Sequence, residues 1–539
     1  MGQDIKTDEP KAKERAGLLH RLFERAWHET SATHDRSSIH KSQLDLSDIQ
    51  GIILRGYRMP MVRHFLLRVL VPAVARKALG RLVSGDESDA PQITTAEEWQ
   101  VGFAPGPGDS PTDLPRRKPD YCLNVGITWP GLVALEVNGL VPALSFKSFS
   151  AFTEGAAARA HLVGDTGPSA PENWIDGFGT GYDHIMVTLH AISPEAMATY
   201  SDKLSAVFTE GGAFHEVWRT DGMALTETVD GKPKFTAKLH FGYIDGISMT
   251  TIRGGPERYT PDHQQPCEPW LFVLQDDAEN YYLPEPRELG LNGSFAVFKV
   301  IETDVVGFEN HLQSNKEKID PELLAAKMCG RWRNGIPLAL SPETDSPPGG
   351  ISAEQLNNFE YVNADGSGDP EGLRCPIGAH IRRANPRGQP IAGQGQPGGS
   401  NNTHRMIRRG MPYGPVYDPT QPYDGIERGL LGYFINASIE NQYEFVLGHW
   451  VNDSEFAGAF RLNPKSKDPI VGTQDPAEGV FVIPQPNGAP SINVVGFSSF
   501  IRTKASAYCF LPSVTAIKFI ANLPFMKESV PSQRKEKKI

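Results

Sequence analysis

Cysteine is scarce in this chain, and its few cysteines are not arranged in pairs. The 539 residues contain 5 cysteines, scattered between positions 122 and 509, and no two of them are spaced as C-x-x-C. An odd number of scattered cysteines argues against a disulfide framework and against a zinc ribbon. We therefore expect a reduced, cytoplasmic protein.

Long apolar runs and excess positive charge are missing as well. No run of about 18 apolar residues is present, so we expect no transmembrane helix and no membrane partner. The segment Met1–Lys6 lacks the basic-then-apolar layout of a secretory signal. The net charge of −11 argues against nucleic acid as a partner, because binding to phosphates needs a basic surface. What remains is the composition of a soluble globular protein.

The length of the chain predicts more than one domain. Strand and helix signals fill two stretches, which are parted near Thr260–Pro266, where prolines interrupt a segment without periodicity. We therefore predict an N-terminal domain over 41–262 and a C-terminal domain over 263–520. A polar arm over 1–40 and a basic tail over 521–539 are expected to flank them.

Both halves repeat units of strand, helix and strand. Ser193-Pro194 is a helix start, with a hydroxyl N-cap followed by proline at the first helical position, and the helix is expected to reach Thr209. A second helix is expected over Pro321–Trp332. Strands are expected over His64–Val71, Tyr121–Trp129, Asp183–Ile192, His215–Trp218, Pro269–Leu274, Ser294–Ile301, Leu430–Ala437, Val494–Phe500 and Ala507–Leu511. This pattern predicts an α+β fold, with antiparallel sheets covered by helices on one face.

The segment Cys375–Arg387 places one histidine among glycine, proline and arginine, and it predicts irregular structure. The His380 imidazole could ligate iron, provided that its other ring nitrogen finds an acceptor. The neighbouring Arg382, Arg383 and Arg387 could neutralise the two propionates of a haem. The alternative is a surface or packing histidine, which the residue type alone favours.

Two further residues could complete a site that reacts with peroxide. Asp245 lies between Gly242 and Gly246, and a carboxylate held there could take a proton from hydrogen peroxide and return it. Taken alone, an Asp-Gly turn between strands is the simpler interpretation. Arg408, in the basic segment His404–Pro415, could stabilise the charge that develops during O–O cleavage. Taken alone, a solvated basic loop is the simpler interpretation.

Ordered blocks of sequence from about Leu44 to Pro512 resemble the dye-decolorising haem peroxidases. The blocks are Asp48–Gly56, Leu123–Leu132, Phe152–Ala160, Gly242–Gly246 (the G-x-x-D-G signature of that family), Asn292–Lys299, Cys375–Arg387 and Arg408–Gly414. The resemblance implies two ferredoxin-like domains, with haem b held mainly by the C-terminal one.

The resemblance also implies a role for individual residues. His380 matches the proximal iron ligand, Asp245 the distal acid–base residue and Arg408 the distal arginine. Asp468 matches the carboxylate that hydrogen-bonds the proximal imidazole, and Arg382 is the expected contact of a haem propionate. Such a carboxylate makes the histidine more electron-donating and favours higher-valent iron.

The strand that follows Gly429 departs from the family, which often has an aromatic residue there. This chain reads Leu430-Leu-Gly432-Tyr-Phe434, so we predict Leu430 and Phe434 as walls of the cofactor pocket and a distal side that Gly432 widens. Electrons from bulky donors could pass through surface aromatic residues, with Tyr417 and Trp450 as candidates. For Trp450, its helical spacing from Tyr443 favours core packing instead.

The resemblance predicts a haem peroxidase that reduces hydrogen peroxide and oxidises dyes, phenols or other organic donors through a ferryl-oxo intermediate. A carboxylate base must be ionised while turnover consumes protons, so we expect an acidic optimum at roughly pH 3–5. The alternatives are a haem carrier or sensor without turnover, and a binding protein without haem. The presence of both Asp245 and Arg408 favours the enzyme, and the sequence leaves an oligomer possible.

Overall fold

The structure is a computed structural model, and all of the residues that it describes belong to one compact unit, Leu44–Ile539. It describes residues 44–85, 89–97, 99, 118–140, 146, 149–256, 266–275, 283–391, 401–418, 423–454, 456–457 and 466–524. The predicted arm, most of the predicted linker and most of the predicted tail lie outside these residues. The predicted domain boundary at 262/263 lies outside them too, and it stays a prediction.

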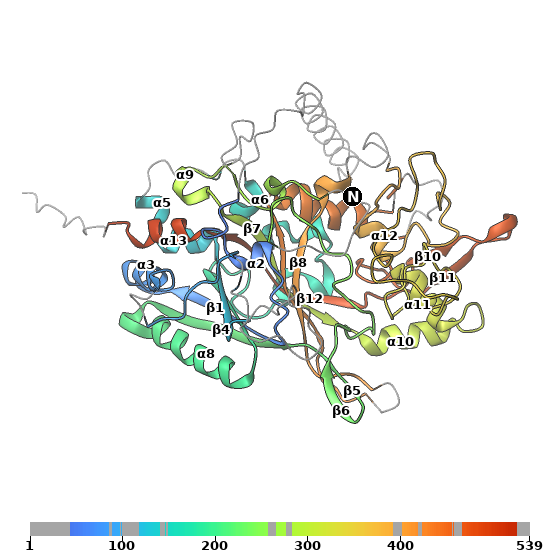
Figure 1. The fold of residues 1–539 in the computed structure, drawn as a ribbon, viewed down its shortest axis with the longest axis horizontal. Coiled ribbons are helices and arrows are strands. Elements are labelled where there is room, and N and C mark those ends of the chain that lie inside the picture. Colours follow the sequence, from blue (N-terminus) through green and yellow to red (C-terminus); the bar gives the residue numbers. More distant parts are fainter. Residues whose placement is uncertain are drawn as a thin grey trace, which may run out of the picture. The chain divides into compact units, whose positions relative to one another are not determined.

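One antiparallel sheet of eight strands is the centre of the fold, in the order β4-β1-β3-β2-β12-β7-β9-β8 (Figure 1). Its strands are β1 (Met61–Val69), β2 (Tyr121–Thr128), β3 (Ile185–Ala191), β4 (Phe214–Met223), β7 (Ser294–Thr303), β8 (Ile407–Tyr413), β9 (Gly429–Asn436) and β12 (Ile501–Leu511). Two hairpins stand apart from it, made of β5 (Thr226–Val229) with β6 (Lys232–Phe235) and of β10 (Val480–Ile483) with β11 (Ile492–Val495).

The sheet consists of two halves with the same topology. In each half the first strand lies between the fourth and the third, and the second strand follows the third, which is the arrangement of a ferredoxin-like βαββαβ unit. The predicted α+β class with two ferredoxin-like units is therefore confirmed. The halves join edge to edge where β2 pairs with β12, with Thr128 opposite Cys509 and Ile127 opposite Phe510.

Helices and turns connect these strands. The α-helices are α2 (Gly51–Leu54), α3 (Pro72–Arg81), α4 (Trp129–Ala134), α5 (Val137–Leu140), α6 (Ser150–Glu154), α7 (Ala156–Arg159), α8 (Pro194–Thr209), α9 (Arg287–Gly290), α10 (Val305–Ser314), α11 (Pro321–Cys329), α12 (His380–Ala384) and α13 (Val514–Ala521). Two π-helices, η9 (Ile439–Glu444) and η10 (Val446–Val451), follow β9. The 3₁₀ turns are η3 (Ala160–Val163), η4 (Gly167–Ser169), η5 (Pro171–Asn173), η6 (Glu210–Gly212), η7 (Pro269–Leu271), η8 (Asn401–His404) and η11 (Pro486–Gly488).

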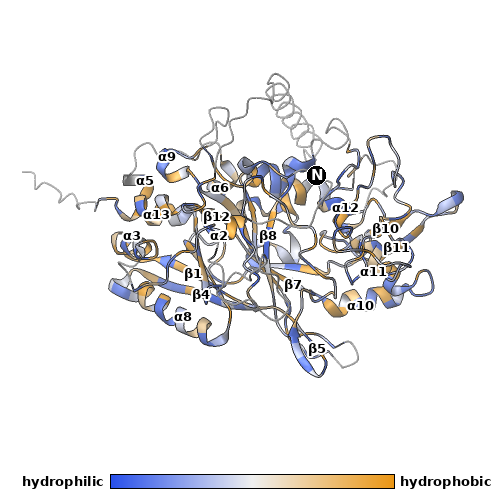
Figure 2. Ribbon diagram, viewed as in Figure 1, coloured by the Kyte–Doolittle hydropathy of each residue, from blue (hydrophilic) through white to orange (hydrophobic). Residues whose placement is uncertain are grey.

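The longest helix begins where the sequence predicted it. The Ser193 hydroxyl accepts a hydrogen bond from the backbone N–H of Ala196, and Pro194 occupies the first turn of α8. The helix packs on strands of the first half of the sheet. Figure 2 shows that its surface carries both apolar and polar residues, as a helix that covers one face of a sheet requires.

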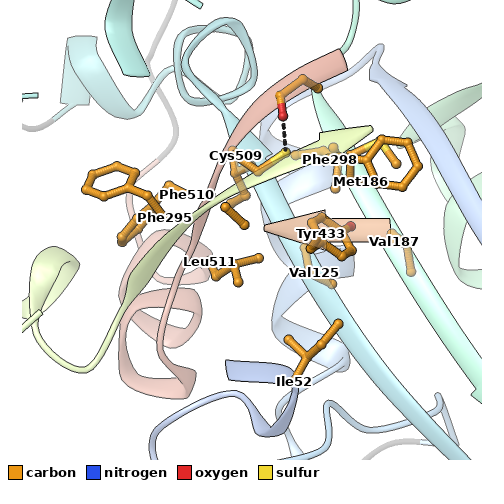
Figure 3. Packing of buried hydrophobic residues seen from close by; sticks show 14 of the residues in the cluster. Ile52, Val125, Met186, Val187, Phe295, Phe298, Tyr433, Cys509, Phe510 and Leu511 are labelled. Atoms are coloured by element: carbon orange, nitrogen blue, oxygen red, sulfur yellow. Dashed lines mark hydrogen bonds between the residues drawn. The ribbon is translucent and has the colours of Figure 1, made fainter. Parts of the chain in front are cut away.

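A shared apolar core holds the two halves together. Val125 and Met186 of the first half pack in one cluster with Phe298, Tyr433 and Phe510 of the second half (Figure 3). These side chains are at most 4% exposed. Because burial of apolar area is the main stabilising contribution to folding, the halves stabilise each other as one folded unit.

Two predicted strands are wrong in whole or in part. The segment Pro269–Leu274 begins with the 3₁₀ turn η7, because proline at a first turn favours a helical start and donates nothing to a strand ladder. The predicted strand Val494–Phe500 overlaps only the end of β11, since Gly496 takes a φ of 77° and the chain leaves the hairpin there. The predicted helix Pro321–Trp332 ends at Cys329, before Gly330 with a φ of 94°.

The two basic segments are more regular than their glycines and prolines suggested. Cys375–Arg387 contains the short helix α12, which begins at His380. His404–Pro415 contains strand β8, so the interpretation as a solvated loop is wrong for Arg408. Proline is tolerated in β8 because this strand is at the edge of the sheet.

The five cysteines are all free and buried. The thiol of Cys509, for example, lies in the core beside the backbone carbonyl of Ala507 (Figure 3). No helix in the described part of the chain has both the length and the apolar character that crossing a membrane requires.

Candidate functional site

A large cavity opens beside the second half of the sheet. Its volume is about 1030 Å³, near the upper end of the range of about 300–1,000 Å³ for small-molecule sites. The wall comes from the loop that carries Asp245, from β7, β8 and β9, from α12, and from the π-helices. His380, Asp245, Arg408, Leu430 and Phe434 all line it, so five of the seven predicted site residues face one space.

On one side of the cavity, His380 is oriented by a buried carboxylate. Nδ1 of His380 is 2.8 Å from Oδ2 of Asp468, whose side chain is fully buried. The other oxygen of Asp468 accepts hydrogen bonds from the backbone N–H groups of Ile470 and Val471, each at 2.9 Å. An ionised carboxylate can only accept, so Nδ1 of His380 carries the hydrogen and Nε2 keeps a lone pair for a ligand.

The ionised state of Asp468 follows from the balance of its surroundings. Burial alone would raise the pKa of this carboxyl, but its interaction with His380 and the two backbone donors outweigh burial. The net effect holds the pKa of Asp468 below its ordinary value. This is the arrangement in which a carboxylate fixes the tautomer of a histidine whose other ring nitrogen is available to a metal.

Asp245 and Arg408 meet at the same cavity. Nη2 of Arg408 donates to Oδ1 of Asp245 at 3.2 Å, and the two side chains are 43% and 47% exposed. Asp245 is in a loop between Gly242 and Gly246, which take φ values of 86° and 82° that favour glycine. Arg408 extends from the edge strand β8. The interpretation of Asp245 as a simple turn between two strands does not match this placement.

A histidine that the sequence analysis passed over ties these two segments together. His240 lines the cavity, and its Nε2 is 2.8 Å from the backbone oxygen of Tyr413 at the end of β8. Burial lowers the pKa of His240, which favours the neutral ring with Nε2–H as the donor. The bond joins the Asp245 loop to the strand that carries Arg408.

Strand β9 forms part of the cavity wall along residues 430–434. Leu430 and Phe434 line it as predicted, and Gly432 lies between them without a side chain. Gly432 takes a φ of 148°, and a Cβ built there would lie 2.0 Å from the backbone oxygen of Arg409. Glycine is therefore required by the close approach of β8, and the row of side chains has a gap between Leu430 and Phe434.

The predicted role of Arg382 as a propionate contact is wrong in this structure. Arg382 is fully buried and does not line the cavity. Its guanidinium donates to the carboxylate of Asp369 at 3.0 Å and to the backbone oxygens of Asp369 and Cys375 at 2.7 and 2.6 Å. Arg383 is likewise buried among backbone carbonyls. Both arginines hold loops together.

A different arginine, Arg405 of the second basic segment, lies at the cavity. It lines the cavity, it is 8% exposed, and within the described residues it pairs with no carboxylate. The hydrogen-bond contact that its guanidinium makes among the described residues is with the Cys267 thiol, at 4.0 Å. A buried cation on a cavity wall is stable when an anion of a ligand compensates it. The sequence signal was its spacing, three residues before Arg408.

Trp450 and Tyr417 differ in exposure. Trp450 is 2% exposed and packs against Phe445, Phe456 and His404, which agrees with the core-packing interpretation. Tyr417 is half-buried, and the Arg428 guanidinium lies 5.4 Å from the centre of its ring.

Comparisons with known proteins agree on one family, although no protein-family model matches the chain. The chain is 28% identical over 509 residues to a "Dye-decolorizing peroxidase" of Mycena epipterygia, across 89% of this chain and 87% of that protein. It is 27% identical over 524 residues to "Dye-decolorizing peroxidase msp1" of Mycetinis scorodonius, across 92% and 91%. The solved structure of an ancestral D-type dye decolorizing peroxidase matches with a TM-score of 0.70 at 27% identity, across 88% of this chain and 99% of that one.

Proposed function

We propose, from the premise that this chain belongs to the dye-decolorising peroxidase family, that its cavity binds haem b through His380. The chain is a peroxidase that uses hydrogen peroxide to oxidise dyes, phenols or other organic donors. Bound haem would supply a redox-active iron for the two-electron reduction of peroxide. The remaining question is what the residues of the chain contribute.

The observation that carries the proposal is the pair of His380 and Asp468. Peroxidases hold haem iron by a proximal histidine, and a hydrogen-bonded carboxylate raises the basicity of that ligand. His380 lines a cavity of about 1030 Å³ and has one ring nitrogen bound to the buried carboxylate. The residues present therefore fit the cofactor.

The charge of the wall supports the same cofactor. Haem carries two propionates, and Arg405 is a nearly buried cation whose charge needs an anionic partner. Apolar side chains of Leu430, Phe434 and Val446 form further parts of the wall and suit a porphyrin ring. We assign the propionate contact to Arg405.

Asp245 and Arg408 supply the acid–base and electrostatic parts of the reaction. Asp245 accepts a proton from one oxygen of hydrogen peroxide and delivers it to the other oxygen, which leaves as water. Arg408 stabilises the negative charge that develops on the leaving oxygen, because its guanidinium is always protonated. The 3.2 Å contact between the two holds both groups on one side of the cavity.

Two further expectations remain proposals. The five free, buried cysteines favour a reducing compartment, such as the cytoplasm, for the folded chain. The pairing of Asp245 with Arg408 favours turnover over a haem carrier or sensor, because storage needs no acid–base residue on the open side. The relatives give no support to a carrier.

Haem reconstitution of the parent and of His380→Ala tests the proposal directly. The parent is expected to show a Soret band and to change its spectrum when one equivalent of peroxide is added. His380→Ala is expected to bind haem more weakly and with an altered spectrum, because the axial nitrogen is lost. His161→Ala, at an exposed histidine far along the chain from the ligand, is the matched control.

The same experiment can reject the assignment. A His380→Ala protein with the haem affinity and spectrum of the parent would show that another group holds the iron. Steady-state oxidation of a dye by peroxide then separates an enzyme from a haem carrier, since a carrier would bind haem without turnover.

A further inference from the structure

A row of aromatic rings leads from the cavity into the protein. Phe434 on β9 lines the cavity, and its ring centre is 5.3 Å from that of Tyr443 on η9. The Tyr443 ring centre is in turn 6.3 Å from that of Tyr508 on β12. Tyr443 is 1% exposed and Tyr508 is 3% exposed. Tyr443 also lines the cavity and Tyr508 does not, so Tyr508 lies behind Tyr443 as seen from the cavity.

Tyr508 has a built-in acceptor for its phenolic proton. Its hydroxyl donates to Oε1 of Glu444 at 2.9 Å. Glu444 is 6% exposed, and Arg159 holds both of its oxygens through Nε at 2.7 Å and Nη2 at 2.6 Å. Arg159 also reaches Glu154, at 2.8 Å, whose side chain is 51% exposed. The carboxylate that faces Tyr508 is therefore fixed in place and connected to the surface.

Tyr443 lacks such an acceptor. Its hydroxyl has no hydrogen-bond partner of suitable geometry among the described residues. Three charged groups act on it: the carboxylates of Asp165 and Glu444, and the Lys299 ammonium, which is a donor and is itself paired with Asp165 at 2.7 Å. Burial raises the pKa of Tyr443 to about 12, and burial together with Glu444 raises the pKa of Tyr508 as well, so the two tyrosines differ in having an acceptor and not in the direction of the pKa shift. A phenol that cannot release its proton is hard to oxidise, so an electron can pass by way of Tyr443 without leaving an oxidised ring there.

We infer that Tyr508 is a redox-active tyrosine, which gives an electron to the cavity through Tyr443 and its proton to Glu444. This inference rests on the proposed function, because the oxidant is the peroxide reduced in the cavity. Reduction of one hydrogen peroxide to two waters takes up two electrons and two protons. Tyr508 supplies one of those electrons, bound haem would supply the other, and the two protons come from solvent. The O–H bond of the Tyr508 phenol breaks, and its proton moves to Oε1 of Glu444. A one-electron donor later returns the electron, and the proton moves back.

This arrangement gives the peroxidase a place to hold an oxidising equivalent away from the cavity. Peroxide accepts two electrons at once, whereas phenolic donors give one at a time, so one equivalent must wait for the second donor molecule. On Tyr508 this oxidising equivalent is separated from the cavity by the Tyr443 ring. The site is buried, and the Tyr508 oxygen and the Glu444 carboxylate stay close enough for the proton to return. Side chains of the cavity are thereby spared from oxidation.

The test uses the haem-loaded full chain, one equivalent of peroxide and no donor, followed by rapid freezing and electron paramagnetic resonance. The parent is expected to give a tyrosyl radical signal, which narrows when the protein is made with ring-deuterated tyrosine. Tyr508→Phe keeps the ring and is expected to lose the signal. Glu444→Gln leaves Tyr508 in place but removes the basic acceptor of its proton, so this variant is also expected to lose the tyrosyl radical signal.

A matched control is Tyr57→Phe. Tyr57 is also buried and hydrogen-bonded, at 2.8 Å, but to the neutral amide of Asn124, and it does not line the cavity. Its removal is expected to leave the signal unchanged. Haem absorption and peroxide consumption, measured on each sample, verify that the variants are folded and loaded.

Three outcomes overturn the inference. A full tyrosyl signal in Tyr508→Phe, or no tyrosyl signal in a parent that consumes peroxide, rejects Tyr508 and leaves the proposed function standing. A parent chain that binds no haem or consumes no peroxide rejects the proposed function and the inference together.

Discussion

Asp245 and Arg408 are 163 residues apart in the chain, yet Nη2 of Arg408 lies 3.2 Å from Oδ1 of Asp245. The contact joins a glycine-flanked loop to the edge strand β8, and both side chains face the cavity. Either residue alone has an ordinary structural explanation. Their meeting at the cavity that His380 also lines makes the acid–base interpretation specific enough to test.

Asp245→Asn is expected to retain haem and to lose peroxide-driven oxidation. Asparagine keeps the shape of the side chain but cannot take up a proton, and loss of a positioned acid–base residue lowers rates by about 10²–10⁴-fold. The measurement is kcat/KM for hydrogen peroxide with a saturating dye. Asp475→Asn is the control, since Asp475 is another carboxylate of the cavity wall. Equal losses in both variants would contradict a special role for Asp245.

Asp468→Asn is expected to weaken haem binding and to raise the reduction potential of the bound iron. The amide no longer donates electron density through the hydrogen bond to His380, and loss of such a partner lowers metal affinity or activity by about 10–100-fold. Haem titration and a spectroelectrochemical measurement check the two effects. An unchanged potential would show that the 2.8 Å contact has no electronic effect on the ligand.

Substitutions of Arg382 and Arg405 are expected to have different effects, the first on the stability of the fold and the second on haem affinity. Arg382→Leu leaves the buried Asp369 without its cation, which costs about 3–5 kcal/mol of the free energy of unfolding. Arg405→Leu removes a cation that no carboxylate of the described residues neutralises, so it is expected to lower haem affinity with little loss of stability. Thermal unfolding of the haem-free variants and haem titration give the two readouts. The reverse pattern would reassign the propionate contact.

Gly432→Ala is expected to destabilise the protein and to lower its activity. The new methyl would lie 2.0 Å from the backbone oxygen of Arg409, so β8 must shift and carry Arg408 with it. A non-glycine residue at a positive φ adds strain of about 1–3 kcal/mol. The free energy of unfolding and kcat/KM for peroxide are the measurements. Gly410→Ala, where a Cβ would meet its nearest neighbour at 3.8 Å, is the control.

The stability of the protein is expected to fall with pH across the acidic range in which the enzyme should work best. Burial lowers the pKa of His311 to about 4, and its ring packs against Phe497 and Phe500. The unfolded chain takes up a proton near pH 6.5 while the folded chain stays neutral, so stability is full above that pH and is lost progressively toward pH 4. One such group changes the free energy of unfolding by at most about 1.4 kcal/mol for each pH unit.

His311→Leu provides the comparison for this pH dependence. Leucine fills the same apolar site without a titratable group, so the melting temperature of the variant is expected to depend less on pH between about 4 and 6.5. Differential scanning calorimetry at several pH values measures it. Parallel curves for the parent and the variant would mean that His311 does not contribute.

Much of this architecture could be predicted from local patterns. The N-cap of α8 and most strands of the sheet follow from periodicity and capping, which depend on neighbouring residues. The segment Pro269–Leu274 failed because an apolar run of strand length does not distinguish a strand from a buried turn. The resemblance to a family brought Asp245, Arg408 and Asp468 together, since nothing in their local sequence reveals a contact across the fold.

The errors in the candidate site have one physical origin. Arg382 and Arg405 are both arginines in basic segments, and only the path of the backbone decides which guanidinium faces the cavity and which one is surrounded by carbonyl groups. Tyr443 and Glu444 are adjacent in sequence, but their roles depend on Tyr508, which comes from the last strand of the sheet. Burial and partners of this kind arise from tertiary structure.

The edge-to-edge pairing of β2 with β12 has a consequence for synthesis on the ribosome. The N-terminal four strands are translated long before residues 501–511, so the edge of β2 must remain unpaired until β12 has been synthesised. An open edge is a template for mispairing with other chains. Nascent chains truncated before β12 should therefore aggregate more readily than chains that include it, and the cavity proposed to bind haem can form only after β12, which supplies part of its wall, has been synthesised.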